Sequence, residues 1–174
     1  MEIGASPLFR GISEESQQAM RTCFDMREVS FRADEVIYDF GAGRNMVGVL
    51  AEGAAVIERI DQQGSRTILE RLESGGVFGE MLMFENVAGD SITVVAACRV
   101  WFMAADQVTK RCEKACTHHT QVVENMFQLV AEKATSLYER VEVLSRRSIR
   151  DKLMCYFSLM AAKNRSGEFL LPFS

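Results

Sequence analysis

The sequence predicts an α+β protein in which a short helix, a small antiparallel β-barrel or sandwich and a long helical region follow one another. Two observations support this prediction. From Val29 to about Ala105, short β-rich runs are separated by glycine-containing turns, as in antiparallel barrels and sandwiches. From Asp106 onward, glycine is absent until Gly167 and the apolar residues repeat with a helical period.

Local signals define the first elements. Ser13, followed by two glutamates, is an N-terminal helix signal and predicts a short leading helix over residues 13–25. The stretch AAVIERIDQQGSRTILERL, residues 54–72, alternates on both sides of a turn-forming segment. It predicts a β-hairpin that turns at residues 61–64.

The long helical region carries a heptad pattern. Apolar residues follow one another at spacings of 4 and 3, and we call them the heptad stripe: Val123, Phe127, Val130, Ala134, Leu137, Val141 and Leu144. A helix of about 30 residues is roughly 45 Å long, which exceeds what one small barrel covers. The stripe therefore predicts a parallel two-helix dimer interface, with Val122, Met126 and Tyr138 on the flank that faces the same chain's barrel. The alternative is that the stripe packs on the barrel itself.

A second helix is expected after Leu144. Ser148 can cap it with Asp151 three residues on, and an apolar face follows at Ile149, Leu153, Tyr156, Phe157 and Met160. The segment KNRSG predicts its end, and EFLLPFS predicts extended chain after it. Because an extended segment needs a partner, we expect the natural protein to continue.

Composition limits the function. The chain has 174 residues and a net charge of −4, which argues against a protein that coats nucleic acid. The N-terminus has no basic region followed by an apolar core, and no run is long enough to span a bilayer, so we expect a cytoplasmic protein without a membrane partner. Five cysteines at uneven spacing fit reduced thiols. No catalytic triad or phosphate loop is present, and we expect no enzyme activity.

The stretch GGVFGEMLMFENVAGDSITVVAA, residues 75–97, has the features of a ligand-holding loop between strands. Gly75 and Gly76 permit a tight turn, and Gly79 permits close approach of the backbone to a ligand. Residues 80–83 can form one helical turn whose free N–H groups would seat an anion. The Glu80 carboxylate can accept hydrogen bonds from ligand hydroxyls.

The order of parts resembles the bacterial cyclic-AMP receptor protein and fumarate-nitrate regulator (Crp/Fnr) family of transcription regulators. The segments that carry the resemblance are the glycine-turned strands, GGVFGEMLMFEN, the long helix and LSRRSIRDKLMCYFSLMAAKN with FLLPFS. The resemblance implies a jelly-roll-like antiparallel β-roll of the cyclic-nucleotide-binding type. It implies a β-roll effector-sensing domain at 1–110, a dimerisation helix at 111–146 and the start of a DNA-binding domain at 147–174. Homodimers would bind DNA through a helix-turn-helix domain that follows residue 174.

The resemblance also implies a binding site. Carried over by position, the effector-binding residues are Phe78, Gly79, Glu80, Met81, Asp90, Ser91, Thr135 and Ser136. Relatives hold the cyclic phosphate with an Arg-Ser pair, and here the pair is Asp90-Ser91. Reversing a unit charge about 4 Å from a phosphate changes the interaction from attraction to repulsion. The sequence therefore disfavours cyclic AMP and leaves open a different small-molecule effector or none.

Two alternatives stay open. Cys112, Cys116 and His119 lie at spacings of 4 and 3, so on one helix they would share a face and could hold a metal or haem, or sense redox state through thiols. The competing interpretation is that the cysteines are buried as small hydrophobic residues and that the adjacent His118 and His119 are polar residues at a helix start. The chain could also be a dimeric scaffold without a ligand, which ligand-induced thermal stabilisation would distinguish from a sensor.

Overall fold

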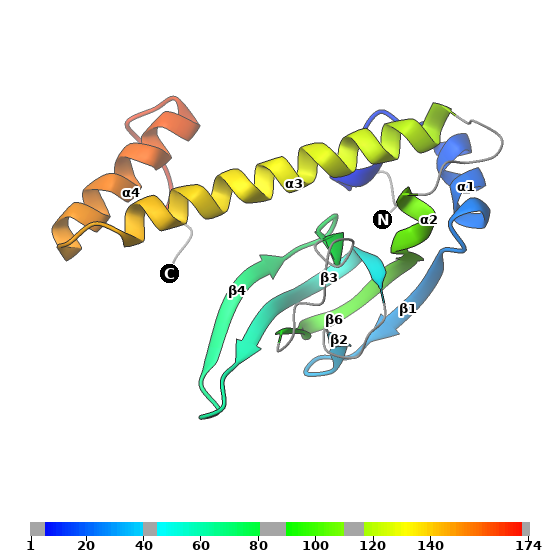
Figure 1. Cartoon of the computed structure of the whole chain (residues 1–174), viewed down its shortest axis with the longest axis horizontal. Helices are drawn as coiled ribbons and strands as arrows, with labels where there is room; N and C mark the ends of the chain where they lie inside the picture. The colour runs from blue at the N-terminus through cyan, green and yellow to red at the C-terminus, as the bar shows by residue number, and fades with distance from the viewer. Residues whose placement is uncertain (1–5, 40–44, 81–89, 110–116, 172–174) are drawn as a thin grey trace. The chain divides into compact units, whose positions relative to one another are not determined.

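The structure is a computed structural model and describes residues 6–39, 45–80, 90–109 and 117–171, without the side chains of residues 39, 90, 109 and 117. The elements follow in this order: η2 (Pro7–Phe9), α1 (Glu14–Cys23), β1 (Arg27–Phe31), β2 (Val36–Asp39), β3 (Met46–Ile60), β4 (Arg66–Leu72), β5 (Val77–Phe78), β6 (Asp90–Ala104), α2 (Ala105–Thr109), α3 (Thr117–Leu144) and α4 (Ile149–Asn164) (Figure 1). The predicted α+β class is confirmed.

The chain forms two compact units, Met1–Leu129 and Val130–Ser174. The first unit contains the whole sheet, and the second contains α4 with the C-terminal part of α3. The predicted division at residues 110 and 146 concerns functional roles and stays a prediction.

The sheet is built around β3 and β6, which lie side by side in Figure 1. All pairs are antiparallel, and the main order is β1-β6-β3-β4, with β2 on β6 and β5 on β3. The predicted hairpin is confirmed: β3 pairs with β4 up to Ile60 opposite Arg66, and the Asp61 carboxylate accepts from the N–H groups of Gln63 (2.9 Å) and Ser65 (2.8 Å).

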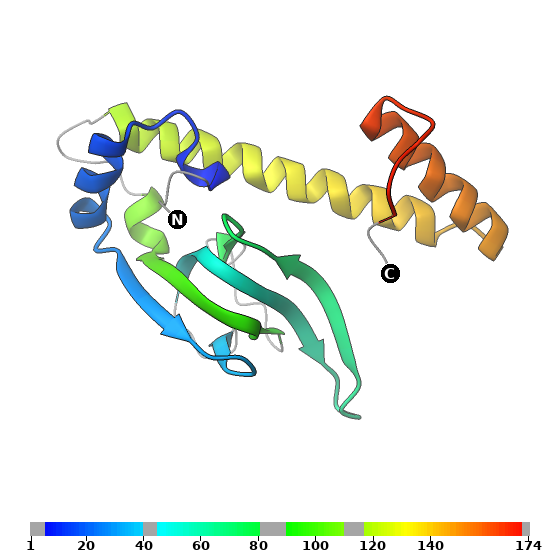
Figure 2. The same ribbon diagram turned by 180° about the vertical axis from the view of Figure 1, so that it is seen from behind.

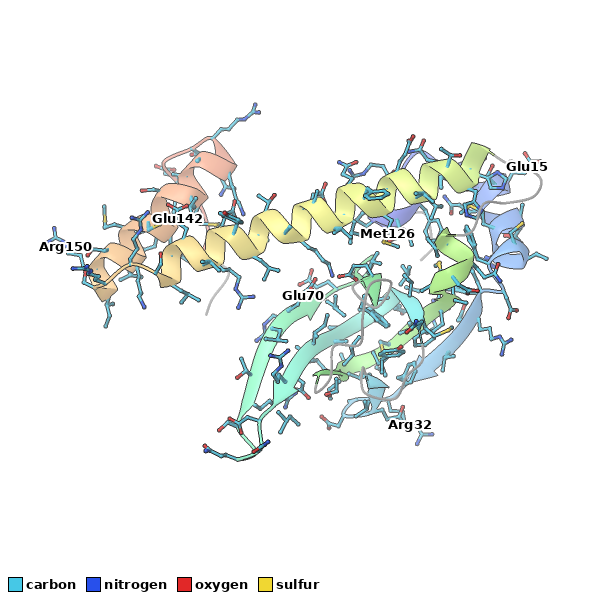
Figure 3. All side chains as sticks on the ribbon, in the orientation of Figure 1. Glu15, Arg32, Glu70, Met126, Glu142 and Arg150 are labelled. Carbon is cyan, nitrogen blue, oxygen red and sulfur yellow. The ribbon has the colours of Figure 1, made fainter. Side chains whose placement is uncertain are left out.

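Two apolar clusters lie on the strands. The interior cluster fills the β-roll and consists of Ile37, Tyr38, Leu50, Ala55, Leu72, Phe78, Ile92, Val94, Cys98, Val100 and Phe102, with Phe31, Met46 and Ile57 packed against it. The helix-facing cluster joins Val47, Val49, Val77 and Met103 to residues of η2, α1, α2 and α3. Met126 lies on the sheet-facing side of α3 (Figure 3), and Val122 is also buried there, as predicted for that flank.

The leading helix is confirmed with its cap. Ser13 Oγ accepts from the Ser16 N–H, and α1 begins at Glu14. The segment before it is tied to α3 by Asn125, which is buried. The Asn125 side-chain amide donates to the carbonyl oxygens of Leu8 (2.9 Å) and Arg10 (2.8 Å). The first unit therefore includes the beginning of α3.

In the second unit, α4 lies beside the C-terminal part of α3 in both ribbon views (Figure 2). The predicted cap is confirmed, since Ser148 Oγ accepts from the Asp151 N–H, and the helix stops at Arg165 in the left-handed conformation. An ion pair joins Lys163 to Glu139. Tyr138 lies in the second unit, where its side chain is 82% exposed, and its packing on the chain's own barrel stays a prediction.

None of the helices among the described residues combines the length and the apolar character that a membrane span requires.

Replacing Asn125 by alanine should lower the free energy of unfolding by about 1–3 kcal/mol, because the buried Leu8 carbonyl oxygen and the part-buried Arg10 carbonyl oxygen lose their donor. Urea denaturation followed by circular dichroism measures this loss. Glu124→Ala is the matched control, since Glu124 is the exposed neighbour on the same helix. Equal stabilities for the two variants would contradict this role of Asn125.

Candidate functional site

The turn that leads into the predicted loop is held by backbone hydrogen bonds to β3. The Gly75 N–H donates to Leu50 O (2.7 Å), and the Leu50 N–H donates to Gly76 O (2.8 Å). Ser6 Oγ donates to the Gly75 carbonyl at 2.8 Å. The tight turn predicted at Gly75 and Gly76 is confirmed, and it fixes where β5 begins.

Phe78, the first predicted site residue, belongs to the interior cluster. Its ring is fully buried and lies edge-on to Phe102, with 5.9 Å between centroids, and tilted to Tyr38 at 6.5 Å. A Cβ at Gly48 would lie 2.0 Å from this ring, so the strand opposite must carry glycine there. Packing accounts for the position of Phe78, and its role in effector binding stays a prediction.

Gly79 is required for a reason that differs from the one expected. Its φ is +82°, and a Cβ there would lie 2.2 Å from the carbonyl oxygen of Met46 on β3. The close approach is therefore to the neighbouring strand, and it is sufficient to require glycine without any ligand. Sequence reasoning could not find this contact because Met46 is 33 positions away in the chain.

Glu80 follows Gly79 at the end of the described segment and is buried, with 4% of its surface exposed. Met81 and the rest of the predicted helical turn lie outside the described residues, as does most of the expected anion seat. The structure therefore places the Glu80 carboxyl inside the protein and leaves the hydrogen bonding of the loop as a prediction.

Asp90 and Ser91 open strand β6. In the ladder with β3, Asp90 pairs with Arg59 and Ser91 pairs with Glu58, and Ser91 also pairs with Asp39 of β2. The structure describes the backbone of Asp90 but not its side chain. Both predicted residues thus stand at the same end of the roll as the β3–β4 hairpin.

A buried carboxylate beside Ser91 was missed by sequence reasoning. Glu58 is 3% exposed; its Oε1 accepts from the Thr93 hydroxyl at 2.6 Å, and its Oε2 forms an ion pair with the Arg66 guanidinium. These contacts link β3, β4 and β6. The sequence contains no signal for these contacts. A Glu-Arg pair in an alternating strand is equally typical of two charged side chains exposed to solvent.

Thr135 and Ser136 lie on α3 in the second unit, whereas Gly79 to Ser91 lie in the first. The Thr135 hydroxyl donates to the Ala131 carbonyl one turn back at 2.9 Å, and Ser136 lines a groove between α3 and α4. The predicted site residues therefore belong to two different units. Their joint role in one site stays a prediction.

The thiol and metal alternative rests on residues that are only partly described. Cys112 and Cys116 lie outside the described residues. His119 packs edge-on against Phe24, with 5.0 Å between centroids, and its Nε2 lies 3.1 Å from the Val108 carbonyl oxygen. Among the residues that the structure describes, no three histidine, cysteine or acidic side chains gather closely enough to hold a metal ion. Burial, with Glu35 nearby, raises the pKa of the Cys98 thiol, which lowers its reactivity.

Gly79→Ala should destabilise the protein more than Gly64→Ala. Both glycines have a φ of +82°, but a Cβ at Gly64 meets nothing within 4 Å, whereas at Gly79 it meets the Met46 carbonyl oxygen. The left-handed conformation alone costs alanine about 1–2 kcal/mol, and the clash adds to this at Gly79 only. Thermal unfolding of the two variants measures the difference. Equal losses would contradict the close approach to β3.

Comparisons with known proteins agree with this architecture. The family described as "cyclic nucleotide-binding domain" matches residues 28–115. The comparison with curated proteins finds no match. Several solved structures share the fold at low sequence identity.

The catabolite activator protein of Thermus thermophilus matches with a TM-score of 0.66 and 20% identity over 80% of this chain and 63% of its own. The sensor domain of the transcriptional regulator DNR from Pseudomonas aeruginosa gives 0.58 and 17% over 84% and 93%. A mutant of CooA from Carboxydothermus hydrogenoformans gives 0.62 and 15% over 88% and 94%.

The chain thus spans 63% of the length of the Thermus protein, and at these identities the structural matches establish the fold alone. The sequence match is independent of them. It covers half of the chain, from the second residue of β1 through β6 and α2. The antiparallel roll with flanking helices is thus a cyclic-nucleotide-binding fold, and the chain belongs to the cyclic nucleotide-binding domain family.

Proposed function

We propose that the chain is the effector-sensing and dimerising region of a Crp/Fnr-type transcription regulator. Structural neighbours described as a catabolite activator protein and as the sensor domain of a transcriptional regulator support this proposal. In the proposed protein, a small molecule binds in the β-roll, two copies pair through α3, and DNA-binding domains follow the second unit.

The observation that carries the proposal is a second apolar face on α3. One face, with Val122, Met126 and Leu129, is buried in the helix-facing cluster. The heptad stripe is a different face, and four of its large members are between 54% and 70% exposed: Phe127, Leu137, Val141 and Leu144. Exposed apolar residues in a continuous 4-3 repeat favour a partner helix over solvent.

The proposed mechanism follows from the continuity of α3. The helix begins in the first unit, where Asn125 ties it to the N-terminal segment, and it extends through residue 144 into the second unit. A ligand that touches the roll and the region of Thr135 and Ser136 would change how two α3 helices pair. Because a symmetric dimer reads two half-sites, a small change in pairing would reposition the DNA-binding domains.

The ligand proposed for the roll is not cyclic AMP. Asp90 takes the position at which relatives carry an arginine, and a carboxylate repels a cyclic phosphate. A different small-molecule effector is proposed instead, and a dimer that binds no effector is the alternative outcome.

Sedimentation velocity at micromolar concentration should give a mass of twice 19.5 kDa for the unaltered chain. Leu137→Glu and Val141→Glu should each shift the population to monomers, because each buries a charge in the predicted seam. Ala131→Glu, on an exposed position outside the stripe, is the matched control and should leave the dimer intact. A monomeric unaltered chain would contradict the dimer proposal.

Calorimetry should detect no binding of cyclic AMP to the unaltered chain, and Asp90→Arg should increase the affinity by about tenfold or more, as expected for about 1.4 kcal/mol or more of regained attraction. Glu15→Arg makes the same charge change on an exposed position of α1 and should have no effect. Tight binding of cyclic AMP by the unaltered chain would overturn the interpretation of Asp90.

A further inference from the structure

The turn between α3 and α4 is rich in basic residues. Four of the seven residues from 146 to 152 are arginine or lysine, and Asp151 is the single acidic one. The whole chain has a net charge of −4, so this segment has the opposite sign to the chain as a whole. A cationic segment on an acidic chain indicates a local role for its charge.

Hydrogen bonds hold this turn in place. The Arg146 N–H donates to the Val143 carbonyl oxygen at 3.2 Å, and the Lys152 N–H donates to the Ser148 carbonyl oxygen at 3.0 Å. Ser148 Oγ also accepts from the Asp151 N–H at 3.1 Å, which caps α4. The basic side chains therefore start from a hydrogen-bonded backbone.

The acidic side chains near the turn already have partners. Glu142 pairs with Arg146 at 2.7 Å, and the Asp151 carboxylate accepts from the Ser148 hydroxyl at 2.7 Å. Three basic side chains remain, and we call them the turn cations: Arg147, Arg150 and Lys152. Among the described residues, no acidic side chain forms an ion pair with any of them. Arg147 and Arg150 are exposed, and Arg150 lies at the start of α4 in Figure 3.

Two of the turn cations stand at the unfavourable end of their helix. Arg150 and Lys152 lie in the first turn of α4, where the helix dipole and the free N–H groups carry positive partial charge. Cations at this end are repelled, and helix stability alone favours acidic residues there. An external anion beside the turn would offset this repulsion.

We propose that the turn cations form a docking surface for the phosphate backbone of duplex DNA. The proposal rests on the proposed function in transcription regulation and deepens it, because it places a DNA contact outside the DNA-binding domains. Charge complementarity supports it: the three cations lie within six residues on an exposed turn, and a duplex presents a phosphate charge about every 1.7 Å along its axis. Such contacts position a protein on DNA without reading its sequence.

Fluorescence anisotropy with a labelled random-sequence duplex tests this surface on the unaltered chain. Three phosphate contacts per bound chain predict that the affinity falls about 40-fold between about 50 and about 200 mM salt. Arg147→Gln combined with Arg150→Gln leaves one contact and should reduce this fall to about fourfold. Arg32→Gln combined with Arg71→Gln is the control, since it makes the same charge change at exposed positions of the first unit and should keep the larger fall.

Thermal unfolding distinguishes docking from a structural role. Loss of Arg147 and Arg150 should leave the melting temperature unchanged or higher, because cations are unfavourable at this helix end. A lower melting temperature with an unchanged salt dependence would assign the two arginines a structural role and overturn the inference.

The other outcomes separate this inference from the proposed function. No binding of DNA at low salt, or equal effects of the two double variants, overturns the inference. Tighter binding to phosphatidylserine vesicles than to DNA, lost in the same variant, assigns the surface to membranes and also overturns it. In each case a chain that sediments as a dimer leaves the proposed function intact. A monomer whose DNA binding depends on Arg147 and Arg150 overturns the dimer proposal and supports the inference.

Discussion

The rest of the first unit depends on the pairing of β3 with β6. Both strands have 15 residues, and their ladder extends from Met46 opposite Ala104 to Arg59 opposite Asp90. Within the part of the chain that the structure describes, every other strand pairs with one of these two. Because side chains alternate across a strand, the ladder places one set of apolar residues inside the roll and another against the helices.

Buried polar groups link this ladder to the rest of the protein. Glu58 joins β3 to β4 and β6, and Asn125 joins α3 to the segment before α1. Removing either partner of such a bond would leave a polar group buried without compensation, which costs more than the bond itself contributes. These contacts therefore favour a single arrangement over alternative registers. Helix α3 is continuous from the first unit into the second.

Much of the fold could be predicted from the sequence because its signals are local. The caps at Ser13 and Ser148, the hairpin at 61–64 and the turn at Gly75 depend on neighbouring residues, and all are confirmed. Contacts between distant residues could not be predicted. The sequence shows a glycine at position 79. It does not show that the Met46 carbonyl oxygen lies so close that only glycine fits there.

The candidate site divides in the same way. The glycines and Glu80 predict a site in the loop before β6, and this stays a prediction because residues 81–89 lie outside the described residues. The burial of Glu58 and the pairing of Arg59 with Asp90 depend on strand register and could not be predicted. The most direct test of the account is a crystal structure of the unaltered chain. The account predicts two copies whose α3 helices pair in parallel through the heptad stripe, with Leu137 and Val141 buried between them. A monomer, or two copies that pair through another face, would contradict it.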